Sequence, residues 1–159
     1  MLDNQKNVCR LVVLLFLAAG CVKTLDEDKV RVGDSITSFE VWSATDCFRS
    51  PDDIKRWKAA VVFIDPECDD CHRYVSVLNE CEGIIVISRS EDGDKVRKFI
   101  EETGIKHDVF YKGGYDAYYS MFRSIVPRVL FVRDSRIEKI FAEPSVPGAD
   151  EIRQYVQYQ

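Results

Sequence analysis

Hydrophobic residues follow two kinds of pattern along most of the chain. Short apolar runs rich in β-branched residues are too short for core helices and predict buried strands. These runs lie at 59–65 (AAVVFID), 83–89 (GIIVISR), 126–134 (VPRVLFVRD) and 137–143 (IEKIFAE). Apolar positions three and four residues apart predict helices at 68–81, at 91–105 and after Pro147, with Gly104 placed as a C-terminal stop. The order β-α-β-α-β-β-α predicts an α/β fold, a sheet with helices on both faces.

Four other segments carry weaker patterns. Apolar alternation over 36–41 predicts an outer strand or hairpin. The segment 47–57 (CFRSPDDIKRW) contains a Ser-Pro pair before acids, which favours a short helix or a loop. A short strand is expected at 108–111 (DVFY) and a helix at 115–122 (YDAYYSMF).

Length and charge narrow the class of protein. A chain of 159 residues suits one domain that buries a core without help from a metal or a disulfide. The formal net charge is −5 at pH 7, and lysine and arginine are scattered along the chain. A nucleic-acid partner would need a concentrated basic face, so none is expected.

The N-terminal segment has the pattern of an export signal. Two basic residues and the apolar stretch LVVLLFLAAG precede Cys21. This stretch is shorter than the ~20 residues that span a bilayer as a helix, and LAAGC resembles the bacterial lipobox, whose cysteine is acylated. We therefore predict a lipoprotein signal peptide at 1–20, a lipidated Cys21 with a tether over 21–31, and a folded domain over 32–159. The alternatives are a plain secretory signal or a buried strand.

Removal of the signal and lipidation of Cys21 leave four thiols, at Cys47, Cys68, Cys71 and Cys81. Outside the cytoplasm, thiols are either paired or kept reduced by a dedicated electron supply. If Cys68 and Cys71 form a redox pair, the other two either form a structural disulfide or remain two buried thiols. Spacing alone leaves both alternatives open.

The stretch DPECDDCHR (65–73) places Cys68 at the start of the predicted helix and Cys71 one turn into it. Free N–H groups and the positive end of the helix dipole favour a thiolate at the first cysteine. The second sulfur is then close enough to resolve a mixed disulfide. This context predicts that Cys68 attacks a disulfide and that Cys71 completes the exchange.

Three segments, VGDSITSFEV, VVFIDPECDDCHRYVSVLNE and YYSMFRSIVPRVLFVRDSRIEKIF, together resemble the thioredoxin fold. The resemblance covers about residues 32–158 and is nearest to membrane-anchored thiol–disulfide oxidoreductases of the TlpA and ResA type. It implies a three-layer α/β/α sandwich with a mixed central sheet. It also implies that Pro127 is cis and shapes a peptide groove, while the backbone of Val126 pairs with substrate. From the sequence alone, Pro127 is equally compatible with a trans proline at a strand entrance.

Two positions depart from the family pattern. Glu67 replaces the aromatic residue that usually precedes the first cysteine, and Val62 replaces a buried acid, so the proton acceptor for Cys71 is unassigned. Glu67, Asp69 and Asp70 are candidates, although acids at a helix start more often stabilise the helix through its dipole. These acids oppose a thiolate at Cys68, and only a protonated His72 would relieve them. We therefore expect a reducing couple.

The sequence offers two alternatives to a redox function, a zinc site and a partner-binding module. A zinc site would add His72 and His107 to Cys68 and Cys71, but no paired-ligand spacing supports it, so no metal and no cofactor are expected. The second is a thioredoxin-fold lipoprotein that binds a partner and has little redox activity, with an aromatic groove near Pro127. That groove would be lined by Phe110, Tyr111, Tyr115, Tyr118, Tyr119 and Phe122. The alternative, which such a cluster more often indicates, is the core side of an added helix.

The expected location is the cell envelope, with the domain tethered by lipid and facing the periplasm or the exterior. The expected substrates are exported proteins with disulfides. Nothing in the chain resembles a Gly-rich nucleotide-binding loop, so electrons are expected from a membrane donor.

Overall fold

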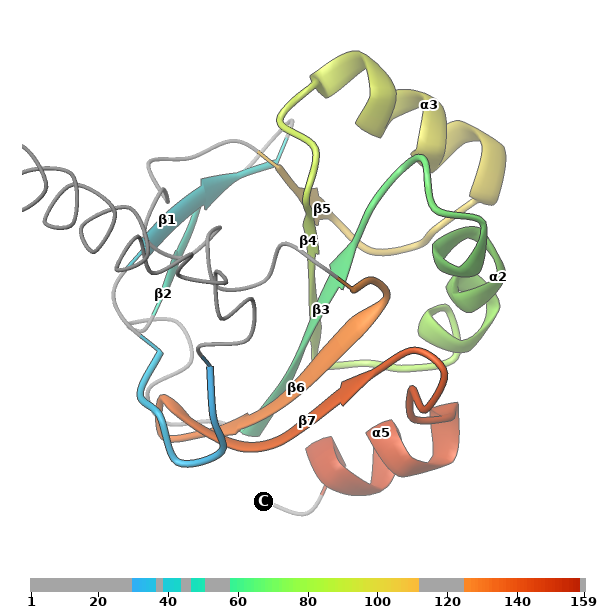
Figure 1. Cartoon of the computed structure of the whole chain (residues 1–159). Helices are drawn as coiled ribbons and strands as arrows, with labels where there is room; N and C mark the ends of the chain where they lie inside the picture. Colours follow the sequence, from blue (N-terminus) through green and yellow to red (C-terminus); the bar gives the residue numbers. More distant parts are fainter. Residues whose placement is uncertain (1–29, 37–38, 44–46, 51–57, 112–124, 158–159) are drawn as a thin grey trace, which may run out of the picture.

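The fold is built around a mixed five-stranded sheet with the strand order β5-β4-β3-β6-β7. A computed structural model describes residues 30–36, 39–43, 47–50, 58–111 and 125–157 (Figure 1). β3, β4 and β5 run parallel, whereas β6 pairs antiparallel with β3, and β7 antiparallel with β6. In chain order the elements are β1 (Phe39–Trp42), β2 (Cys47–Ser50), β3 (Lys58–Ile64), α2 (Asp69–Leu78), β4 (Ile84–Ser88), α3 (Gly93–Thr103), β5 (Val109–Phe110), β6 (Arg128–Arg133), β7 (Arg136–Ala142) and α5 (Ala149–Gln157).

The central strand β3 supplies both sides of the core. Successive side chains of a strand point to opposite faces of the sheet. Val62 and Ile64 therefore join a buried cluster shared with the helices, while Val61 and Phe63 join a second cluster on the opposite face. A strand buried on both faces explains why this segment is continuously apolar.

All three described helices pack against the same face of the sheet. Leu78 of α2, Phe99 of α3 and Ile152 of α5 belong to one core cluster with β3 and β6, and Figure 1 shows these helices together on one side. Val30 and Ile36 are part of the cluster on the other face. The helix expected at 115–122 lies outside the described residues, so helices on both faces remain a prediction.

The N-terminal part of the domain contains a separate two-stranded sheet. β1 and β2 pair antiparallel, with Trp42 opposite Cys47 and Phe39 opposite Ser50. The predicted outer strand is confirmed as β1, but the prediction of a helix or loop over 47–57 is wrong for 47–50. The strand there depends on pairing with β1, which the local Ser-Pro signal does not report. Residues 51–57 lie outside the described part of the chain.

The helix ends near the cysteines have specific caps. α2 ends at Leu78, three residues earlier than predicted. The side chain of Asn79 then bonds the loop that follows α3, donating to Gly104 O and accepting from Lys106 N. α3 starts after Asp92, whose carboxylate accepts from two backbone N–H groups of the first turn. It ends at Gly104 in the left-handed conformation, with φ of 62°, as predicted.

Within the described ranges, no helix combines the length and the apolar character that crossing a membrane requires. The segment 1–20, Cys21 and most of the tether lie outside those ranges.

Candidate active site

The two cysteines of the C-x-x-C motif lie at the N-terminus of α2, as the sequence predicts. Cys68 is the N-cap residue with extended backbone, and its Sγ accepts a hydrogen bond from Cys71 N at 3.4 Å. Both side chains are free thiols. An N-cap sulfur that receives a backbone N–H is well placed to carry negative charge.

Cys68 and Cys71 have different environments. Cys68 is partly exposed, whereas Cys71 is 0% exposed and belongs to the core cluster under the helices. Burial raises the pKa of the Cys71 thiol, and the neighbouring Cys68 adds to that increase. A backbone hydrogen bond from Asp65 N to Cys71 Sγ, at 3.4 Å, acts in the opposite direction. The accessible sulfur is therefore suited to attack and the buried one to resolution.

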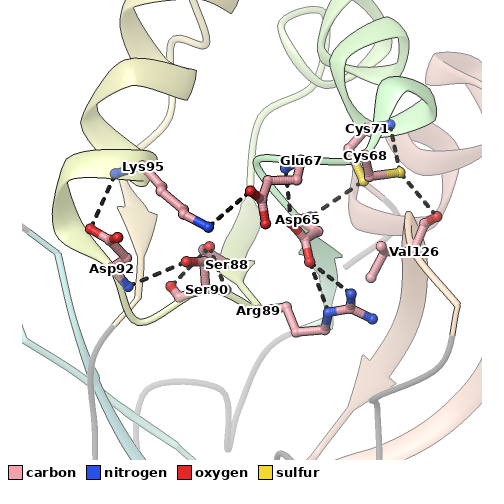
Figure 2. Close-up of polar contacts among 10 residues, drawn as sticks. All are labelled: Asp65, Glu67, Cys68, Cys71, Ser88, Arg89, Ser90, Asp92, Lys95 and Val126. Atoms are coloured by element: carbon pink, nitrogen blue, oxygen red, sulfur yellow. Dashed lines mark hydrogen bonds and ion pairs between the residues drawn. The ribbon is translucent and has the colours of Figure 1, made fainter.

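The loop before β6 faces the first cysteine. The Val126–Pro127 peptide bond is cis, as the resemblance implied. The Cys68 thiol donates to the carbonyl oxygen of Val126 at 3.5 Å, although the two residues are far apart in the chain. In Figure 2 a dashed line joins the Val126 carbonyl oxygen to the Cys68 sulfur. A peptide lying along this loop would pass directly over Cys68.

Salt bridges partly offset the acids around Cys68. Glu67 pairs with Lys95 of α3 at 2.8 Å, and Asp70 pairs with Arg73 one turn along α2. Both pairs are exposed and contribute little to stability, but each cation reduces the negative charge near the sulfur. The repulsion expected from the sequence is therefore smaller than the count of acids suggests.

His72 has a structural environment. Its Nε2 lies 2.8 Å from Pro66 O, and its ring packs edge-on against Phe99. These contacts tie α2 to the loop before it and to α3. The expectation that a protonated His72 would relieve charge at Cys68 finds no contact to support it among the described residues.

Asp65 contacts Cys71 and Arg89 contacts Asp65, and neither residue received a role from the sequence. Asp65 follows β3 and Arg89 follows β4, and the carboxyl ends of parallel neighbouring strands meet at one edge of a sheet. Asp65 Oδ2 accepts from Arg89 Nε at 2.9 Å and lies 2.8 Å from Arg89 Nη2. The signal was present in the sequence as two charged residues directly after two adjacent buried strands.

Of the two alternatives left open for Cys47 and Cys81, the structure has a free thiol at Cys81. Cys81 is a buried free thiol that donates to Val77 O at 3.3 Å and lies 3.8 Å from Ala149 O, between α2 and α5. Cys47 belongs to β2 of the separate hairpin (Figure 1). The core under the helices encloses the Cys81 sulfur, so the alternative of a buried thiol holds for Cys81. The side chain of Cys47 lies outside the described part of the structure.

The histidines proposed for a zinc site lie at opposite ends of α2. His72 contacts Pro66 near the N-terminus, whereas His107 Nε2 lies 3.0 Å from Leu78 O at the C-terminal end. Among the described residues, no group of three or more histidine, cysteine or acidic side chains is arranged to hold a metal ion.

The predicted aromatic groove is only partly within the described residues. Phe110 packs with the cluster on the face away from the helices, whereas Tyr111 packs with the cluster under them. These two residues therefore do not line one surface. The other four aromatic residues lie outside the described part of the chain.

The sheet order, the helix that begins at a C-x-x-C motif and the cis-proline loop facing it define a thioredoxin-like fold. Solved structures that match this fold include StoA and proteins described as thiol–disulfide oxidoreductases. StoA from Bacillus subtilis has 11% identity and a TM-score of 0.60, and the match covers 77% of this chain and 98% of that one.

Two further structures give the same result. A thiol:disulfide interchange protein from Bacteroides sp. has 15% identity and a TM-score of 0.63, with 81% of this chain and 90% of that one covered. A secreted disulfide oxidoreductase from Mycobacterium tuberculosis has 14% identity and a TM-score of 0.59, with 76% and 96% covered. No protein-family model matches the sequence, and no curated protein does so. The similarity is thus one of fold.

Proposed function

We propose that this protein is a thiol–disulfide oxidoreductase in which Cys68 is the attacking thiol and Cys71 the resolving thiol. The observation that carries the proposal is the arrangement around Cys68. Its Sγ caps α2, receives the N–H of Cys71 and lies 3.5 Å from the carbonyl of Val126. The fold that this chain shares with thiol–disulfide oxidoreductases and a thiol:disulfide interchange protein supports the same function.

The exchange proceeds in two steps. The Cys68 thiolate attacks one sulfur of a substrate disulfide, the S–S bond breaks, and the first substrate thiolate leaves and takes up a proton. Cys71 then loses its proton, and its thiolate attacks Cys68 Sγ in the mixed disulfide. The second substrate thiolate leaves, and Cys68 and Cys71 end as a disulfide, so two electrons have passed to the substrate.

Val126 and Pro127 are the proposed substrate-binding residues. The carbonyl of Val126, beside Cys68, would accept a hydrogen bond from the backbone of an extended peptide. The substrates we propose are exported proteins with disulfides, and the electron donor is a membrane dithiol protein. Lipid on Cys21 would anchor the domain in the cell envelope, with the tether at 21–31 joining it to the domain at 32–159.

A trapping experiment tests the two cysteine roles. Cys71→Ser should accumulate a mixed disulfide with a disulfide-containing peptide, because resolution is blocked. Cys68→Ser should form none, because the accessible thiol is lost. Cys81→Ser is the matched control, since it removes another buried thiol of the same core and should leave exchange intact. Mass spectrometry of the trapped species identifies the linked cysteine.

A redox titration against dithiothreitol or glutathione, with thiol counting, tests the direction of electron flow. A two-electron couple near or below the thioredoxin value of about −270 mV supports a reductase. A strongly oxidising couple would reverse the direction. The absence of an exchange-competent disulfide would favour the binding-module alternative, for which Cys68→Ser should leave partner binding unchanged.

A further inference from the structure

Asp65 contacts the buried sulfur and a cation at the same time. Its backbone N–H donates to Cys71 Sγ at 3.4 Å, and its carboxylate, 14% exposed, lies against the Arg89 guanidinium (Figure 2). The other carboxylate oxygen accepts from Glu67 N at 2.9 Å, which closes the turn over residues 65–67 just before Cys68. Both oxygens of Asp65 are thus engaged.

The two parts of Asp65 act on Cys71 in opposite directions. Burial is the main cause that raises the pKa of Cys71, and the negative charges of Cys68 and Asp65 raise it further. The N–H of Asp65 lowers it. A cation paired with this carboxylate offsets the unfavourable charge. Arg89 occupies that position, anchored at the end of β4, where its own N–H donates to Ile64 O at 2.7 Å.

We propose that Arg89 is a positioning residue for the resolving step: by pairing with Asp65, it compensates the carboxylate charge beside Cys71. This inference rests on the proposed function. The step it serves is the loss of the Cys71 proton to water, followed by attack of the thiolate on Cys68 Sγ and departure of the substrate thiolate.

A charge series distinguishes this role from a purely structural ion pair. In Arg89→Gln the Asp65 charge is left uncompensated, so resolution should slow. In Asp65→Asn the opposing charge is gone and the cation remains, so resolution should become faster. In the double variant Asp65→Asn/Arg89→Gln neither charge remains, and resolution should return to the parental rate. A structural pair would instead give slower resolution in all three variants.

The measurement uses the full chain in detergent, with Cys9, Cys21 and Cys47 replaced by serine and the buried Cys81 retained. The reduced protein is mixed with dithiodipyridine, an uncharged aromatic disulfide, and release of thiopyridone is followed by stopped-flow absorbance. The first release reports attack by Cys68 and depends on reagent concentration. The second reports closure by Cys71 and does not depend on it.

We expect Arg89→Gln to slow the second release by about threefold to tenfold, since one pKa unit changes the thiolate fraction about tenfold. The first release should be unchanged. Lys95→Gln is the matched control for the second phase, because it breaks the adjacent exposed pair with Glu67 and should leave the second release unchanged. Two results would overturn the inference on Arg89 and leave the proposed function standing. One is an unchanged second release in Arg89→Gln, and the other is a slower second release in all three variants of the series. Absence of the first release in the parent protein overturns the proposed function and, with it, the step that Arg89 serves.

Discussion

At the scale of single residues, the two cysteines of one short motif differ because only one is buried. Cys68 borders solvent at the helix end, while Cys71 is enclosed by the core under α2. Desolvation disfavours the thiolate, so burial raises the pKa of Cys71 in the folded protein. In the unfolded chain the same thiol ionises near its ordinary value of about 8.5.

This difference predicts a loss of stability at alkaline pH. The thiol stays protonated in the folded state after it ionises in the unfolded state, so rising pH favours unfolding by about 1.4 kcal/mol per pH unit for one such group. Between about pH 9 and pH 10, the free energy of unfolding of the parent protein should therefore fall more steeply than that of Cys71→Ser. The difference between the two slopes should be about 1.4 kcal/mol per pH unit. Urea unfolding under reducing conditions measures both slopes, and equal slopes would contradict the pKa shift of Cys71.

At the scale of elements, α2 carries the redox pair and is held by its neighbours. The hydroxyl of Tyr74 donates to Pro147 O at 2.6 Å, which ties the middle of α2 to the segment before α5. The hydroxyl is buried, as is most of the ring. The orientation of the cysteine-bearing helix thus depends on a residue far away in the sequence.

Tyr74→Phe should lower the free energy of unfolding by about 1–2 kcal/mol, because it removes this hydrogen bond and leaves the Pro147 carbonyl without its donor. Urea unfolding at pH 7 measures the change. A loss below about 0.5 kcal/mol would mean that water or a small rearrangement satisfies the carbonyl.

A second contact lies between α5 and the loop that joins α2 to β4. Gly83 has a φ of 68°, and a Cβ added there would lie 2.6 Å from Val156 Cγ1 of α5. Gly104 has a similar φ of 62°, but a Cβ there meets nothing within 4 Å. The two glycines share the conformational requirement and differ in packing.

Gly104→Ala should cost about 1 kcal/mol for its left-handed backbone. Gly83→Ala should cost about 1–3 kcal/mol more, because the new methyl group must displace Val156. Adding Val156→Ala to Gly83→Ala should recover part of that excess. Thermal or urea unfolding of the series measures these losses in the free energy of unfolding. Equal losses at both glycines would show that α5 shifts to accommodate the methyl group at no cost.

At the scale of the whole molecule, the described helices cover one face of the sheet and the redox pair lies at one end of α2 (Figure 1). The chain reaches the sheet at Val30 and Ile36, which pack on the opposite face. A lipid on Cys21 would thus join the domain through a short tether on the face without described helices.

The anchor is tested by replacing Cys21. Cys21→Ser should abolish incorporation of a fatty-acid label and move the protein from the membrane fraction to the soluble fraction, because each buried CH₂ of the lipid contributes about 0.8 kcal/mol to membrane binding. Cys9→Ser is the matched control and should stay labelled. An unlabelled parent protein, or a variant that keeps its label, would contradict lipidation at Cys21.

Local patterns in the sequence were sufficient for most of the fold. Apolar runs located β3, β4, β6 and β7, and the spacing of apolar residues with Gly104 as a stop located α3. The position of Cys68 as the N-cap of α2 followed from the proline-containing turn before it. The cis form of Pro127 came from the family resemblance, because local sequence allows either isomer. β2 was missed, since its strand requires β1 as a partner.

The sequence by itself determined which segments become strands and helices and that the dithiol begins a helix, because these depend on neighbouring residues. Only the tertiary structure decided what surrounds the sulfurs. The Val126 carbonyl reaches Cys68, the Asp65–Arg89 pair lies beside Cys71, and Cys81 stays a buried thiol instead of bridging to Cys47. Each of these contacts joins residues that are close only after the strands pair in their register and the helices pack on one face, which no local pattern specifies.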